Sequence, residues 1–90
     1  MVFAARITVT GRVQGVGFRD FTIREAERRG LTGYVTNLPD GSVEAIAEGP
    51  EIQVRQFISA LKKGPLLARV KAVEIAELPP TGGFPVFEVR

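Results

Sequence analysis

Residues 31–48 read LTGYVTNLPDGSVEAIAE, and the predicted architecture is built around this stretch because it forms a β-hairpin in mid-chain. Small or apolar residues take every second position on both sides of a central turn, which is the alternation of a half-buried strand. The turn, residues 38–41, has proline second and glycine fourth, as type I turns prefer. Two alternating strands joined by a tight turn predict a hairpin.

A helix is predicted on each side of this hairpin. Residues 19–29 (RDFTIREAERR) carry acidic residues early and arginines late, and Gly30 suits the position just past a helix end. In residues 50–63, Pro50 fits the first helical position and Gly64 begins the stop signal. The second helix has an apolar stripe at the i, i+3, i+4, i+7 spacing. The stripe consists of Val54, Phe57, Ile58 and Leu61.

A strand is predicted outside each helix. Residues 3–13 alternate strictly between apolar and polar side chains. Residues 69–77 form another strand, and its apolar parity changes between Ala72 and Val73, which indicates a β-bulge. Residues 84–90 form a short final strand, placed at a sheet edge by the proline near its start.

The element order is therefore β-α-β-β-α-β plus a terminal strand. This order predicts an α+β ferredoxin-like split β-α-β sandwich, with an antiparallel sheet and two helices on one face. The 90 residues are expected to form one domain, residues 1–90, and a monomer. No apolar run reaches the roughly 20 residues of a membrane helix, and the start reads as a strand, so the expected location is cytoplasmic.

The amino-acid composition excludes several kinds of catalytic group. The chain has no Cys, His or Trp, and its only asparagine is Asn37. The absence of Cys and His excludes a disulfide, a thiolate nucleophile, an imidazole base and an ordinary zinc site. Nine arginines against three lysines is a composition found in heat-adapted sources and equally in GC-rich genomes.

The segment GRVQGVGFRD, residues 11–20, joins the first strand to the first helix. A glycine-rich turn that opens a helix directs unpaired N–H groups toward one point, and the helix dipole adds partial positive charge there. Arg19 could add a two-point grip on a phosphate or carboxylate. The glycine spacing matches neither a Walker A loop nor a dinucleotide fingerprint, and glycine-rich connections of this kind are more often plain turns.

Asn37, just before the Pro-Asp-Gly turn, also has two interpretations. Asparagine commonly caps backbone groups in turns. Its amide can also hold a water molecule without ionising.

In a split β-α-β fold, the loop after the first strand and the end of the second strand meet. An anion site beside a held water, without a nucleophile or general acid, would hydrolyse a phosphate compound whose leaving group needs no proton. An acyl phosphate meets that condition.

The combination of GRVQGVGFRDF with GYVTNLPDGSVEAIAEGP resembles the acylphosphatase family over essentially the whole chain. The resemblance implies hydrolysis of small acyl phosphates with release of inorganic phosphate, without a metal or cofactor. It implies that Arg19 binds phosphate and is catalytic, and that Asn37 positions the attacking water. It also implies a phosphate loop formed by the backbone N–H groups of Gln14, Gly15, Val16, Gly17 and Phe18. Asp20 and Tyr34 depart from the residues that we expect most often at those positions.

The alternative is a binding module of the same fold, either for an acyl phosphate without catalysis or for nucleic acid. RNA-binding sheets of this kind stack bases on exposed aromatic side chains. The stretches RITVT and SVEAIAE place no aromatic residue on their outward positions, and the net charge is only +2. We therefore expect no nucleic-acid partner and no membrane partner.

Overall fold

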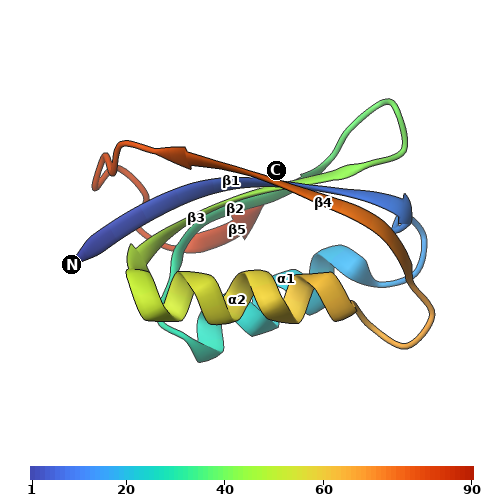
Figure 1. Ribbon diagram of the computed structural model, residues 1–90, viewed down its shortest axis with the longest axis horizontal. Coiled ribbons are helices and arrows are strands. Elements are labelled where there is room, and N and C mark those ends of the chain that lie inside the picture. The colour runs from blue at the N-terminus through green and yellow to red at the C-terminus, as the bar shows by residue number, and fades with distance from the viewer.

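The computed structural model describes all of residues 1–90 and contains two helices and five strands. In chain order these are β1 (Val2–Arg12), α1 (Phe18–Arg28), β2 (Thr32–Asn37), β3 (Val43–Pro50), α2 (Glu51–Lys63), β4 (Arg69–Leu78) and β5 (Phe87–Val89). Both helices cover the same face of one sheet (Figure 1). The predicted α+β ferredoxin-like fold is confirmed. No helix is both long and apolar enough to span a bilayer.

The sheet has the strand order β4-β1-β3-β2-β5. The first four strands pair antiparallel, as predicted, but β5 pairs parallel with β2, so a fully antiparallel sheet was wrong. β4 ends beside the start of β1, where Leu78 faces Ala4. From there the chain crosses to the start of β2 at the other edge, where Phe87 faces Gly33. Entering at that end, β5 must run in the direction of β2.

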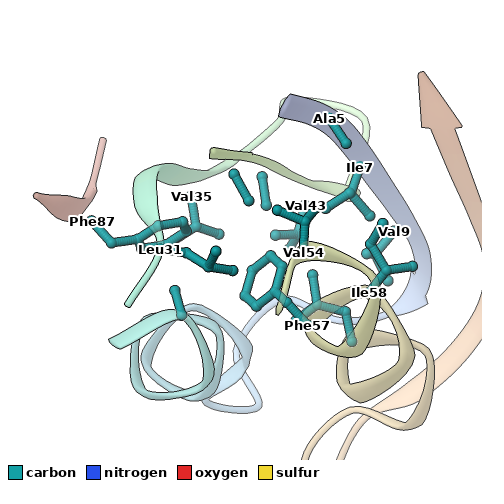
Figure 2. Packing of buried hydrophobic residues seen from close by; sticks show 14 of the residues in the cluster. Ala5, Ile7, Val9, Leu31, Val35, Val43, Val54, Phe57, Ile58 and Phe87 are labelled. Carbon is teal, nitrogen blue, oxygen red and sulfur yellow. The ribbon is translucent and has the colours of Figure 1, made fainter. Parts of the chain in front are cut away.

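One hydrophobic core fills the space between the sheet and the two helices (Figure 2). From β1 it receives Phe3, Ala5, Ile7 and Val9, which are the alternate residues predicted to face inward. The predicted stripe of α2 is buried in full, with Phe57 edge-on to Phe87 of β5 at 5.9 Å between ring centroids. In α1 the buried residues are Phe18, Thr22 and Ala26. The polar Thr22 is tolerated there because its hydroxyl donates to the Phe18 carbonyl.

Two local predictions need correction. Pro50 ends β3 and precedes α2, with ψ of 136°, so it is the residue before the helix and not its first member. The fixed φ of proline suits both positions, so composition could not separate them. The predicted bulge exists but lies earlier in β4, because the register passes from Ala72 opposite Thr10 to Val70 opposite Gly11 and leaves Lys71 unmatched.

The crossing segment between β4 and β5 is held down by Glu48 of β3. Glu48 is only 6% exposed, and its carboxylate accepts hydrogen bonds from the Gly82 N–H at 2.6 Å and the Thr81 N–H at 3.2 Å. The Thr81 hydroxyl donates as well. The Gly82 N–H is the main cause that lowers the pKa of Glu48 below its ordinary value of 4.5.

Glu48→Gln is expected to destabilise the fold at neutral pH by about 1.5–3 kcal/mol, the range for hydrogen bonds to a charged group. Because the folded-state pKa lies below the unfolded one, the carboxylate's contribution is complete above the unfolded pKa and is lost as pH falls through the folded pKa. Urea unfolding of both proteins at neutral and at acidic pH should show the difference shrinking in acid. Glu77→Gln, an exposed carboxylate of β4, is the control and should change little. A Glu48→Gln deficit independent of pH would contradict this account.

Three connections gather at one end of the sheet (Figure 1): the β1–α1 loop, the β2–β3 turn and the α2–β4 loop. The predicted turn at residues 38–41 is closed by a hydrogen bond from the Gly41 N–H to the Leu38 carbonyl, at 3.1 Å. This end of the molecule therefore brings together the glycine-rich segment and Asn37, which are separated by some twenty residues of sequence.

Candidate functional site

The β1–α1 connection, residues 13–17, is called the glycine-rich loop below. Its two glycines have left-handed backbones, with φ of 74° at Gly15 and 79° at Gly17. Residues with a Cβ rarely adopt these angles, and β-branched residues least of all. No atom lies within 4 Å of where a Cβ would stand at either glycine. The backbone conformation, and not crowding, is therefore what requires glycine here.

The glycine-rich loop leaves its N–H groups without acceptors inside the protein. None of the N–H groups from Gln14 to Gly17 donates to a backbone carbonyl or to a side chain. The first bond of α1 runs from the Phe21 N–H to the Gly17 carbonyl at 3.0 Å, and no side chain caps this helix. The N–H groups of the first helical turn are consequently also free, and the helix dipole favours an anion beside them.

A pocket of about 170 Å³ opens between the glycine-rich loop, the start of α1 and the end of β2. Arg19 and Asn37 both line it, so the two residues singled out by the sequence meet at one site. The other lining residues are Val13, Gly15, Gly17, Phe18 and Asp20. Arg19 is exposed and forms no ion pair with any acidic side chain, which leaves its guanidinium donors available.

Asn37 is the last residue of β2 and shares the helix-facing side of that strand with Gly33 and Val35. Its Oδ1 is buried and accepts no hydrogen bond from the protein. A buried unpaired acceptor costs roughly 1–3 kcal/mol, and native structures contain few such atoms. The side chain is therefore not used to cap the adjacent turn, which was the structural interpretation of this asparagine.

Gln14 has a role that the sequence did not reveal. Its Nε2 donates to the carbonyls of Leu38 and Ser42, both at 2.9 Å, and so ties the glycine-rich loop to the β2–β3 turn. These two carbonyls flank the turn just past Asn37. The side chain of Gln14 thus holds the glycine-rich loop and the strand that carries Asn37 in one arrangement. No local pattern around Gln14 could have indicated it, because its partners lie 24 and 28 residues away.

The remaining predicted site residues, Phe18 and Val16, attach the glycine-rich loop to the hydrophobic core. The Phe18 side chain is fully buried, 5.9 Å from the ring of Phe21, and Val16 packs against the same core. Their side chains face inward, so only their N–H groups can contribute to the pocket. The core thereby fixes the positions of the loop's N–H donors.

The two unusual residues noted in the sequence are both partnered. Asp20 lines the pocket, but its carboxylate pairs with Arg24 at 2.9 Å, one turn along α1. Tyr34 lies on the sheet face opposite the helices and donates its hydroxyl to Glu44 at 2.8 Å. The ring of Tyr34 is stacked by the Arg90 guanidinium at 4.6 Å and contacts Phe84. Burial is the main cause that raises the Tyr34 pKa.

A larger cavity of about 480 Å³ lies between α1 and α2 and is lined in part by Glu25, Arg29 and Lys63. Its larger volume does not make this cavity the better candidate for the functional site. The smaller pocket alone combines the free N–H groups, an unpaired arginine and an orphaned amide oxygen. No group of three or more acidic side chains in the chain could hold a metal ion.

The chemistry open to the smaller pocket follows from these groups. Loop N–H donors and a forked guanidinium match the oxygens of a tetrahedral anion such as phosphate. A neutral amide oxygen can accept a hydrogen bond from a water molecule and so orient it. Asp20 is the only acidic side chain that lines the pocket, and it is paired with Arg24.

The chain is similar over most of its length to known proteins of one family. The acylphosphatase family model matches residues 5–89. The chain is 52% identical over 85 residues to an acylphosphatase of Syntrophotalea carbinolica, covering 94% of this chain and 92% of that one. It is 57% identical over 67 residues to an acylphosphatase of Thermus thermophilus, covering 74% and 76%. The crystal structure of acylphosphatase from Bacillus subtilis matches with a TM-score of 0.94 at 42% identity, covering 100% and 99%.

Proposed function

As a member of the acylphosphatase family, this chain hydrolyses acyl phosphates, and we propose that it does so in the pocket between the glycine-rich loop and Asn37. The phosphoryl group is bound by the N–H groups of Gln14 to Phe18 and by the guanidinium of Arg19. These donors neutralise charge on the phosphoryl oxygens in the ground state and more strongly as the group transfers.

Asn37 aligns the attacking water through its side-chain amide. The water then attacks phosphorus in line with the departing carboxylate, giving the free carboxylate and inorganic phosphate. No side-chain base is required, because a phosphate oxygen takes the proton of the water. No general acid is required either, because a carboxylate leaves without protonation. Rate enhancement then comes from positioning and electrostatics.

The observation that carries this proposal is the convergence of Arg19 and the orphaned Oδ1 of Asn37 on one small pocket whose rim of N–H groups lacks internal acceptors. Solvent can satisfy the exposed N–H groups of a plain turn, so the meeting of these donors with Arg19 and Asn37 is what distinguishes this pocket. The same convergence also supports the specific roles given to the loop residues.

Phosphate release from acetyl phosphate, measured with and without EDTA, tests the proposal. We expect turnover that chelation does not reduce, since every group assigned to the mechanism belongs to the protein or the substrate. Loss of turnover in EDTA, restored by added magnesium, would require a metal site that the proposed mechanism lacks. Absence of turnover in both conditions would favour the alternative of a non-catalytic acyl-phosphate binding module.

The nucleic-acid alternative has less support. The aromatic residues of the open sheet face, Tyr34 and Phe84, contact each other and are covered by Arg90. Their ring faces are used within the protein and are not presented for base stacking. Monomeric state and cytoplasmic location stay predictions.

A further inference from the structure

The pocket assigned to the phosphoryl group contains a negative charge of its own. Asp20, the third residue of α1, lines this pocket and directly follows Arg19. Its carboxylate is 70% exposed and pairs with Arg24. Because like charges repel, this carboxylate opposes the binding of an anion in the pocket, whereas Arg19 and the loop N–H groups favour it.

Asp20 and a bound phosphoryl group are stabilised by the same end of α1. The N–H groups of the first helical turn have no acceptor in the protein, and no side chain caps the helix. A carboxylate in the first turn gains from the positive end of the helix dipole, and so does a phosphate at the helix N-terminus. The two anions therefore lie in one positive field, where each reduces what the other gains.

Arg24 draws the Asp20 carboxylate toward the C-terminal end of α1, away from the glycine-rich loop. Its Nη1 is 2.9 Å from the Asp20 Oδ2, and it lies one turn further along the helix. Arg24 itself does not line the pocket. Both side chains are largely exposed, and water and salt weaken the attraction within exposed pairs. Part of the negative charge of Asp20 thus remains effective at the pocket.

We propose that Asp20, held by Arg24, limits the affinity of this pocket for phosphate and so favours release of the product. Hydrolysis leaves inorganic phosphate on the same donors that bound the substrate. Free N–H groups and an unpaired arginine alone would retain that phosphate more tightly, and the carboxylate offsets part of their attraction. This inference rests on the proposed function, because it places the phosphoryl group in this pocket.

Asp20→Asn removes the charge and keeps the size of the side chain. The inhibition constant of inorganic phosphate against acetyl phosphate hydrolysis should fall roughly threefold at low salt, and the KM of acetyl phosphate should fall by a similar factor. The kcat should not rise, since an interaction felt equally in ground state and transition state changes KM alone. Added sodium chloride should shrink the difference between variant and wild type, because salt screens exposed charges.

Arg24→Gln tests the restraint on Asp20. Without its partner the carboxylate is free to turn toward the N–H groups of the first turn, so the inhibition constant of phosphate should rise roughly twofold. The direct effect of the Arg24 charge is present whether or not Asp20 is charged. In the Asp20→Asn background the same substitution should therefore have a smaller effect, and an equal effect would overturn the role given to Arg24.

Glu27→Gln is the matched control for the loss of one negative charge. Glu27 is an exposed, unpaired carboxylate of the same helix, about 10 Å further along its axis. This variant should leave the inhibition constant nearly unchanged. An equal fall in the Glu27 and Asp20 variants would reveal a general charge effect and overturn the proposal, as would an unchanged constant in Asp20→Asn.

Melting temperatures with and without inorganic phosphate separate the charge effect from a structural one. Without phosphate, Asp20→Asn should melt slightly earlier, because an acidic residue in the first turn stabilises a helix. With phosphate, it should gain more than the wild type, since tighter binding gives greater stabilisation. A smaller gain would overturn the proposal. Wild-type protein that neither hydrolyses acetyl phosphate nor is protected by phosphate would instead overturn the proposed function.

Discussion

Arg19→Lys is expected to lower kcat/KM for acetyl phosphate about a hundredfold or more, the loss typical for one donor to a developing oxyanion. Lysine keeps the positive charge and the position on the first turn of α1. It cannot reproduce two parallel N–H donors in one plane, because an ammonium is a compact point charge. Arg19 lines the pocket and has no acidic partner within the protein, so both of its forked donors are free for the phosphoryl oxygens.

Steady-state kinetics on acetyl phosphate, with inorganic phosphate as inhibitor, measures this effect. Arg24→Lys is the matched control: Arg24 is an exposed arginine of the same helix, but its partner is Asp20. That variant should retain near-normal turnover. Near-normal turnover in Arg19→Lys would show that charge neutralisation suffices and that the two-point grip is wrong.

The parts of the fold that were predictable from sequence are those set by local patterns. The alternation on both sides of residues 38–41 and the apolar stripe of α2 each indicate which side of the element is buried. Burial of that side is what stabilises the strands and the helix. The parallel pairing of β5 was not predictable in this way. It depends on where the chain re-enters the sheet after crossing from β4, and on the buried Glu48 that holds the crossing segment.

In the candidate site, too, the features set by local sequence were predictable and those set by distant contacts were not. Gly15, Gly17 and Arg19 are identifiable because glycine and arginine have distinct physical roles in a strand-to-helix connection. The Gln14 side chain joins two segments distant in sequence, and no local pattern reports such a contact. Apolar parity indicated a bulge in β4 but misplaced it, because Val70 and Val73 both pack toward the core across the unmatched Lys71.

Asn37→Ala is expected to lower kcat by roughly a hundredfold to a thousandfold, corresponding to about 2–4 kcal/mol of barrier, while phosphate affinity changes little. In the proposed mechanism the water contact of Asn37 matters mainly in the transition state, whereas Arg19 and the loop N–H groups hold the phosphoryl group. An interaction made chiefly in the transition state appears in kcat and not in ground-state binding. Inorganic phosphate should therefore inhibit the variant and the wild type at similar concentrations.

The stability of the same variant separates this role from a structural one. The Oδ1 of Asn37 is buried without a partner, so removing it deletes an unpaired polar atom, and the melting temperature should hold or rise. Asp40→Ala is the control for turn chemistry, because the Asp40 carboxylate accepts from the Ser42 N–H at 2.9 Å within the β2–β3 turn. That variant should melt earlier with normal kcat. If Asn37→Ala behaved like Asp40→Ala, Asn37 would belong to the turn, and the attacking water would need another residue to orient it.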